Sequence, residues 1–238
     1  VPGQNARVCF YDGSEIRPKV IIAADGRRSL VRRLLDPERT MTYQGYSTWR
    51  GMVPSAHRSL GLEGFHRYYD QAHGTLFSLT APVAPSGHSY WEFSHNITIE
   101  DVGHLLGAPP TERPFLLPHQ VTDQHLNYLD AVMRDHRVPD VLRTVVAGRS
   151  TEVMLLPVND LPLPSRAMWH VGSTNVVLLG DALIPARLQV GAGLNMGVKQ
   201  AAGLVRVLAS AQPLRDWQHE AIDEIAPWIE LGRSRAHR

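Results

Sequence analysis

The chain has 238 residues, 43% hydrophobic and 20% charged, which is enough for one large globular domain or two small ones. A formal net charge of +1 gives no strongly basic surface for nucleic acid, and no apolar run approaches the ~18 residues that cross a membrane. The single cysteine, Cys9, excludes an internal disulfide and is expected in a strand. No signal peptide is visible, so we expect a cytoplasmic protein.

Residues 1–40 predict an α/β segment built around one buried strand. The run Val20-Ile21-Ile22-Ala23-Ala24 is continuously apolar, which is typical of a strand covered on both faces. Asp25-Gly26 ends this strand, and a short helix with its apolar side chains inward should follow. The elements predicted here are a hairpin over 8–11 and 15–24 around Asp12-Gly13, the strand over 20–24 and a helix over 29–35.

Residues 41–160 predict an α+β segment. β-branched and aromatic residues, separated by Gly and Pro, favour an antiparallel sheet. Thr98, with Asp101 three residues later, is typical of a helix start, and Gly107 would end that helix. The elements predicted here are strands over 46–53, 65–69, 75–81, 88–93 and 152–156, helices over 98–107 and 123–136, and a proline-rich connection over 157–164.

Residues 161–211 predict a return to α/β structure. An apolar strand over 176–179 ends in Gly180-Asp181, and the tight turn Gly191-Ala192-Gly193 opens a helix over 194–209. A last helix over 214–231 should be interrupted at Pro227. The predicted fold class is therefore α/β with an α+β insert.

The segment from Gly180 to Gly193 is the most informative part of the chain. A carboxylate at the end of a buried strand, here Asp181, can accept hydrogen bonds from a cofactor hydroxyl, although Asp is also common in turns. Two glycines let the backbone approach a ligand closely. The following helix offers free N–H groups and the positive end of its dipole, which would stabilise a flat heteroaromatic ring that becomes anionic on reduction.

Two motifs in this order resemble those of the FAD-dependent aromatic hydroxylases, the p-hydroxybenzoate hydroxylase family. Residues 180–197 resemble its second FAD-binding motif, and residues 20–32 resemble its Asp-Gly motif, which contacts the FAD and NAD(P)H regions. Residues 46–51 (Tyr-Ser-Thr-Trp-Arg-Gly) resemble the first substrate-domain strand of the dihydroxypyridine hydroxylase-like branch.

The resemblance implies a partial FAD-binding Rossmann-like domain interrupted by a mostly antiparallel β-sheet substrate domain. The Asp-Gly part would be 1–40, the substrate-binding domain 41–160, the returning Gly-Asp part 161–211 and a C-terminal helix 212–238. It implies that Asp181 binds the ribitol, that the backbone N–H groups of Gly193, Leu194 and Asn195 face the flavin pyrimidine, and that Asp25 and Arg32 support the dinucleotide. The implied cofactor-binding residues are Asp25, Gly26, Arg32, Gly180, Asp181, Gly191, Gly193, Leu194 and Asn195.

The activity implied is that of a flavin-dependent monooxygenase. NAD(P)H reduces FAD, O2 adds to the flavin C4a, and the hydroperoxide hydroxylates a small electron-rich aromatic or heteroaromatic substrate. Catalytic residues are not identified by a motif. His66 and His95 fall near strands, where a neutral His could deprotonate a phenol, with a surface histidine or one whose hydrogen bonds are satisfied within the protein as the alternative for each. Leu188 would lie at the flavin face. The predicted substrate contacts are Trp49, Arg50, Tyr68, Trp91 and Leu188, with core packing or an internal ion pair as the alternative for the aromatic and charged residues.

The chain departs from the family pattern at four places. Leu183-Ile184 replaces the frequent Ala-His, Leu188 replaces a Pro beside the reactive flavin face, and Gln200-Ala201 replaces Asp-Ala. No Gly-x-Gly-x-x-Gly motif for the ADP moiety occurs. Because the chain also begins at Val1 in a loop-like sequence, we expect an upstream segment or another chain to supply the ADP-binding half, and this chain alone to bind FAD weakly or not at all. A dimer of this chain is a further hypothesis.

A second hypothesis belongs to another functional class. A truncated, degenerate relative without flavin redox activity could bind a small molecule, catalyse an isomerase-like or cyclase-like step, or serve as a partner subunit. The missing ADP motif and the replacements at Ile184 and Leu188 favour it. None of the 12 histidines has the spacing of a metal site, so no metal is predicted.

Overall fold

The computed structural model describes residues 6–54, 64–80, 87–148, 152–187, 190–210 and 212–235. The chain divides into two compact units, which are considered separately. Unit 1 combines Val1–Met41 with Asp160–Ala236, and unit 2 contains Thr42–Asn159. The fold is mixed α/β with several antiparallel sheets, as predicted. Among the described residues, no helix is long and apolar enough to cross a bilayer.

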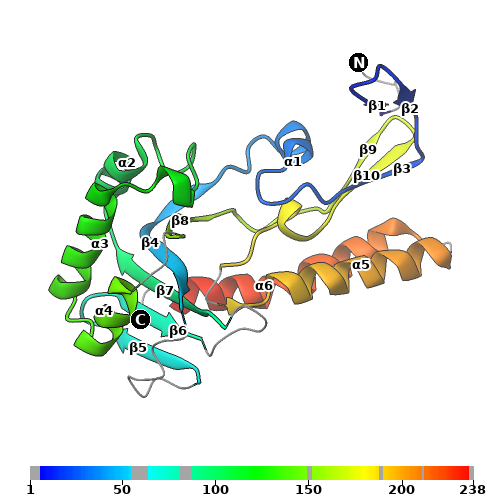
Figure 1. Cartoon of the computed structure of the whole chain (residues 1–238). Helices are drawn as coiled ribbons and strands as arrows, with labels where there is room; N and C mark the ends of the chain where they lie inside the picture. Colours follow the sequence, from blue (N-terminus) through cyan, green and yellow to red (C-terminus); the bar gives the residue numbers. More distant parts are fainter. Residues whose placement is uncertain are drawn as a thin grey trace. The chain divides into compact units, whose positions relative to one another are not determined.

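Unit 1 is built on a three-stranded sheet in the order β3-β10-β9; in Figure 1, β3 is blue and β10 and β9 are yellow. β10 (Thr174–Leu178) pairs in parallel with β3 (Val20–Ala23) and antiparallel with β9 (Met168–Val171). The parallel pairing brings the ends of β3 and β10 to one edge of the sheet. A separate hairpin, β1 (Val8–Cys9) with β2 (Glu15–Ile16), precedes β3 and leaves Cys9 exposed.

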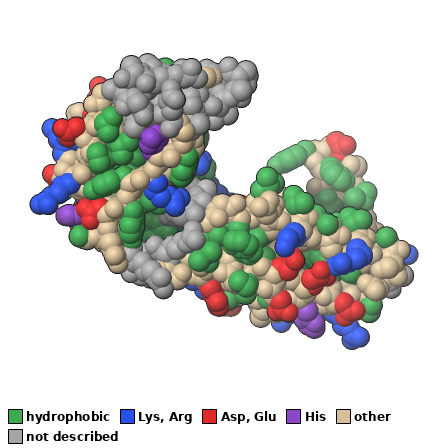
Figure 2. All heavy atoms as spheres, turned by 90° about the horizontal axis from the view of Figure 1, so that it is seen from below, with side chains coloured by type: hydrophobic (Ala, Val, Ile, Leu, Met, Phe, Trp, Pro, Cys, Tyr) green, Lys and Arg blue, Asp and Glu red, His purple; other side chains and the backbone are tan. Residues whose placement is uncertain are grey.

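The helices of unit 1 are α1 (Leu30–Leu35), the 3-10 turn η3 (Gly180–Ala182), α5 (Gly193–Ala209) and α6 (Leu214–Arg235). α5 and α6 pack together, with Trp217 buried and its indole N–H donating to the Gln200 carbonyl at 2.9 Å. Ion pairs Lys199–Glu224 and Arg206–Glu220 also join them. Figure 2 shows such charged side chains along this helix pair with hydrophobic ones between them.

Three expectations for unit 1 are wrong. α6 runs continuously through Pro227, because burial of Trp217, Ile225 and Ile229 outweighs the one backbone hydrogen bond that proline removes. The leucines at positions 30 and 34 of α1 are exposed rather than inward. β3 is not covered on both faces, since the side chain of Ile22 is exposed, and the strand lies at one edge of the three-stranded sheet. β9 was not predicted.

Unit 2 contains a five-stranded sheet in the order β5-β6-β7-β4-β8, with its apolar core on one face. The strands are β5 (His66–Asp70), β6 (Thr75–Leu79), β7 (Ser89–Asn96), β4 (Thr42–Val53) and β8 (Met154–Asp160). The helical elements are α2 (Ile99–Leu106), η2 (Pro118–Gln120), α3 (Asp123–Asp135) and α4 (Asp140–Ala147), of which η2 and α4 were not predicted.

Local signals in unit 2 are confirmed at the start and end of α2. The Thr98 hydroxyl accepts from the N–H of Asp101 at 3.0 Å, and Gly107 ends the helix in the left-handed region at φ 70°. Residues 157–160 of the expected connection over 157–164 instead form the second half of β8, and residues 161–164 lie outside helices and strands. An edge strand accommodates Pro157, since the missing N–H need not enter a ladder.

Candidate functional site

The two ends of the Gly180–Gly193 segment face each other in unit 1. A Cβ placed on Gly193 would lie 3.8 Å from Oδ1 of Asp181, so the missing side chain leaves the carboxylate beside the first turn of α5. Gly180, at φ 58°, turns the chain after β10 and approaches Gly197 of α5: a Cβ on either glycine would lie 3.8 Å from the other's Cα. These close approaches fix η3 against the start of α5.

The start of α5 has no side-chain cap. Ala192 occupies the N-cap position, and Gly191 before it has φ 66°. The first N–H groups of a helix have no partners within it, so they and the positive end of the dipole are directed toward an acceptor outside the helix. Asp181 beside them is partly exposed to solvent. Desolvation of its carboxyl group by the surrounding protein is the larger effect and raises the pKa of Asp181, whereas the positive charges of Arg27 and Arg32 act to lower it.

Arg32 connects the two predicted cofactor motifs. Its side chain is 3% exposed, and Nη1 donates to the carbonyls of Ala182 at 2.8 Å and Asp181 at 3.3 Å. Nη2 donates to the Arg27 carbonyl at 2.6 Å. Desolvation, followed by the charge of Arg39, lowers the Arg32 pKa to about 10. In this structure Arg32 therefore holds η3 in place.

Asp25 caps the helix that follows β3. Its Oδ2 accepts from the N–H groups of Leu30 at 2.8 Å and Val31 at 3.4 Å. Burial acts to raise the pKa of Asp25, but hydrogen bonds from the Ser29 hydroxyl and these N–H groups outweigh it, so the pKa is lowered. Asp25 thus stays ionised where the ends of β3 and β10 meet. Gly26 follows at φ 78°.

Gln200, one of the departures from the family pattern, links α5 to the turn at Gly180. Its Oε1 accepts from the N–H of Gly180 at 2.8 Å, and the side chain is buried on α5. Gln200 therefore stabilises the turn at Gly180 through its side-chain amide oxygen. The other cofactor candidates, Leu194 and Asn195, lie in the first turn of α5, where Leu194 is exposed.

Two arginines that the motifs did not indicate anchor the loop after η3. Arg39 donates to the Leu183 carbonyl at 2.6 Å. Arg187 forms a buried ion pair with Asp160, with Nε–Oδ1 at 2.9 Å, and donates to the Gly232 carbonyl at 3.0 Å. No local sequence signal marks these long-range pairs. Leu188, proposed at the flavin face and as a substrate contact, lies outside the described residues.

The other predicted substrate residues lie in unit 2, on opposite faces of its sheet. Trp49 and Trp91 have no exposed surface and pack in the apolar core, and Tyr68 on the same face donates to the Arg137 carbonyl at 3.3 Å. Arg50 lies on the other face, as strand alternation requires. The part of these residues in substrate binding stays a prediction.

A polar group that was not predicted surrounds Arg50. Glu92 is its cross-strand partner, and the Tyr90 hydroxyl donates to Oε1 of Glu92 at 2.6 Å while contacting the Arg50 guanidinium. Burial and the bond to Glu92 raise the pKa of Tyr90, which keeps the phenol protonated. A cation, an anion and a hydroxyl thus share one face of the sheet.

The two catalytic candidates differ in environment. His95 is fully buried in unit 2, with one ring nitrogen 3.3 Å from the Trp49 indole nitrogen and the other 2.9 Å from the Asn96 carbonyl. Both nitrogens are thus engaged by the protein. His66 is half-buried in β5 on the same face as Tyr68. Catalysis by either histidine stays a prediction.

The comparison with known families decides the classification. The family model described as FAD binding domain matches residues 5–222. The chain belongs to this family. Curated proteins similar to this chain include an FAD-dependent monooxygenase of Aspergillus terreus, 27% identical over 209 residues, and the aurachin C monooxygenase/isomerase of Stigmatella aurantiaca, 28% identical over 203 residues. The matches cover 84% and 85% of this chain but 44% and 45% of those relatives, so the chain spans less than half their length.

Solved structures place the fold in the same group. The 2,6-dihydroxypyridine-3-hydroxylase of Arthrobacter nicotinovorans matches with a TM-score of 0.83 at 19% identity, covering 100% of this chain and 62% of that one. HpxO of Klebsiella pneumoniae, complexed with FAD and uric acid, matches with a TM-score of 0.70 at 22% identity, covering 97% and 54%. The resemblance to the FAD-dependent aromatic hydroxylases is confirmed.

Proposed function

We propose that this chain is part of an FAD-dependent monooxygenase that hydroxylates a small electron-rich aromatic or heteroaromatic substrate with NAD(P)H and O2. The observation that carries this is the position of Asp181 beside Gly193 at the uncapped start of α5. When bound there, FAD would supply the electron transfer and oxygen activation that no side chain can provide. The residues present fit its ribitol and flavin ring, because a carboxylate acceptor, free N–H groups and a glycine-lined approach adjoin one another.

Each residue of unit 1 has a distinct part in this proposal. Asp181 accepts from ribitol hydroxyls, and the N–H groups of Gly193, Leu194 and Asn195 donate to the pyrimidine edge of the flavin. Arg32 and Asp25 act mainly as positioning residues, since their polar atoms already bind backbone groups of the chain. The ADP end of the cofactor would be held by a complementary polypeptide that carries the missing phosphate-binding unit.

Unit 2 would hold the substrate. Arg50 and Glu92, with the Tyr90 hydroxyl between them, present an acceptor and two donors on one sheet face. Such a group suits an aromatic ring with hydroxyl, carbonyl or carboxylate substituents, because each substituent can replace one of these internal contacts. Arg50→Gln should therefore raise KM for such a substrate more than it lowers kcat.

The test uses the chain joined to, or co-expressed with, its complementary polypeptide. We expect a yellow complex that oxidises NAD(P)H faster when a phenol is added. Asp181→Ala should weaken FAD retention at least about tenfold, equivalent to about 1.4 kcal/mol, whereas Asp216→Ala, an exposed position on α6, should retain FAD. A folded, colourless complex without NAD(P)H oxidation would contradict the proposal and favour the non-redox hypothesis.

A further inference from the structure

The loop that leads into α5 is held near its centre by one ion pair. Arg187 and Asp160 are both more than nine-tenths buried, and their side chains meet through two bonds, Nε to Oδ1 at 2.9 Å and Nη2 to Oδ2 at 2.5 Å. This two-point contact fixes the plane of the guanidinium as well as its position. Such a pair contributes little net stability relative to well-packed apolar side chains, and orientation of the chain is the property that it can add.

The last turn of α6 takes part in the same contact. Nη1 of Arg187 donates to the Gly232 carbonyl at 3.0 Å. The next residue, Arg233, donates from Nη2 to the Leu161 carbonyl at 2.9 Å, and its Nε lies 3.7 Å from Oδ2 of Asp160. Three segments of unit 1 therefore meet at the Asp160 carboxylate: the end of β8, the loop before α5 and the last turn of α6.

Gly232 also packs against the residue that precedes the cofactor turn. A Cβ on Gly232 would lie 3.1 Å from Cγ2 of Val190, which is closer than most Cβ contacts in proteins. The N–H of Val190 donates to the Arg187 carbonyl at 3.1 Å and closes a turn. Gly191 follows at φ 66°, and α5 begins at Gly193. A displacement of Val190 would therefore move the first N–H groups of α5, which have no partners within the helix.

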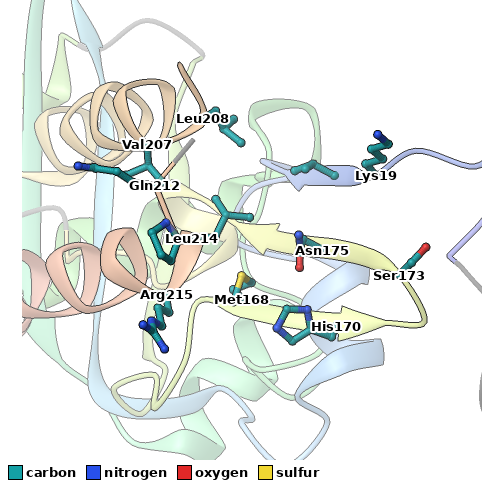
Figure 3. A pocket seen from close by; sticks show the side chains of 12 residues that line it. Lys19, Met168, His170, Ser173, Asn175, Val207, Leu208, Gln212, Leu214 and Arg215 are labelled. Carbon is teal, nitrogen blue, oxygen red and sulfur yellow. The ribbon is translucent and has the colours of Figure 1, made fainter. Parts of the chain in front are cut away.

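The other end of α5 has a different environment, because a cavity of about 800 Å³ adjoins its last turn. Side chains of α5, of the start of α6 and of β9 line this cavity, as Figure 3 shows: Val207, Leu208, Leu214, Met168 and His170. The ion pair Arg206–Glu220 near this end is exposed, and such pairs contribute little to the position of a helix. The start of α5 is thus the end that buried polar contacts hold.

We propose that three residues position the turn at Gly191–Gly193 that opens α5: Asp160, Arg187 and Gly232. The ion pair orients the loop, and the absence of a side chain at Gly232 leaves the space that Val190 occupies. Together these contacts direct the free N–H groups at the start of α5 toward one acceptor position. That this acceptor belongs to a flavin rests on the proposed function, whereas the coupling of Gly232 to Val190 is a property of the chain itself.

The experiment uses the protein that is assayed for FAD retention, and it measures two quantities. One is the rate of hydrogen exchange at the amides of residue 190 and Met196 without flavin, relative to the amides of β10; the other is the dissociation constant for FAD. Gly232→Ala should increase both at least about fivefold, because the new Cβ displaces Val190. In a Val190→Ala background, which lacks Cγ2, the same substitution should change both less than about twofold.

Two further variants complete the test. Arg187→Lys keeps the charge but loses the two-point contact, so it should act in the same direction as Gly232→Ala. Ser234→Ala, at an exposed position of the same turn of α6, should change both quantities less than about twofold.

Two results would overturn the proposal. One is a lower Tm in Gly232→Ala and Arg187→Lys with both quantities unchanged, which would make the contacts purely structural. The other is an effect of Gly232→Ala that persists in the Val190→Ala background. If the unsubstituted protein binds no FAD but hydrogen exchange follows the expected pattern, the result supports the positioning contacts and contradicts only the proposed function.

Discussion

The indole N–H of Trp49 donates to Nε2 of His95 at 3.3 Å in the core of unit 2. The other ring nitrogen, Nδ1, lies 2.9 Å from the Asn96 carbonyl and must therefore carry the proton. This network assigns a neutral imidazole whose two nitrogens are both satisfied. A second proton on Nε2 would face the Trp49 N–H in a ring that is 1% exposed. Burial, reinforced by the charge of His136, lowers the pKa of His95 to about 4.

This arrangement predicts a loss of stability in mild acid. The pKa of a His in an unfolded chain is ~6.5, whereas that of native His95 is about 4. Between these two pH values the unfolded chain therefore binds a proton at this position and the native protein does not. The free energy of unfolding should fall through this window by up to about 1.4 kcal/mol per pH unit from this group. Urea unfolding at several pH values measures the slope. His95→Gln should flatten it, leaving a remainder from His136, whose pKa burial also lowers, whereas His119→Gln at an exposed site should not. An unchanged slope in His95→Gln would contradict this account.

Gly180 and Gly197 should respond oppositely to alanine, although they face each other. Alanine at position 180 must adopt φ 58°, which costs about 1 kcal/mol or more, whereas position 197 is helical and gains about 1 kcal/mol in helix propensity. Each new Cβ would make an ordinary 3.8 Å contact with the opposite Cα. Thermal unfolding should therefore show a lower Tm for Gly180→Ala and a higher one for Gly197→Ala. Equal losses would show that close approach, and not backbone conformation, selects glycine here.

Arg32→Lys should destabilise unit 1 by at least about 2 kcal/mol. One ammonium group cannot reach the three carbonyls that the guanidinium binds, and buried acceptors would lose charged donors. Arg33→Lys is the matched control, since Arg33 is exposed and donates only to the Arg28 carbonyl among the bonds described; it should stay within about 0.5 kcal/mol. Denaturant midpoints at constant m-value provide the comparison.

Asp160→Asn should cost about 3–5 kcal/mol, because the variant leaves the Arg187 guanidinium buried beside a neutral amide. Asp140→Asn removes an exposed ion pair with Arg143 and should cost less than about 1 kcal/mol. Both are measured by urea unfolding. A small effect of Asp160→Asn would mean that water reaches the pair, and would remove its role in anchoring the loop that leads to Leu188.

Structural features that depend on residues close together in the sequence were predicted, whereas those that depend on distant residues were not. The cap at Thr98, the end at Gly107 and the turn after β10 were all visible in the sequence, because each depends on residues within four positions. The helix over 29–35 was found, but its inner side was assigned to leucines. In the structure Arg32 is buried there instead, because its acceptors lie on a segment far away in the chain.

The sequence alone determined the family, the order of the two motifs and the chemical groups at the site, since glycines, an aspartate and a helix start can be recognised locally. Only the tertiary structure decided how these groups meet. Arg32 reaches Asp181 across 149 positions, and the Tyr90–Glu92 contact with Arg50 requires a strand register that no motif specifies. Hydrogen bonds and burial act on neighbours in space, so these partners appear only once the strands and helices are packed.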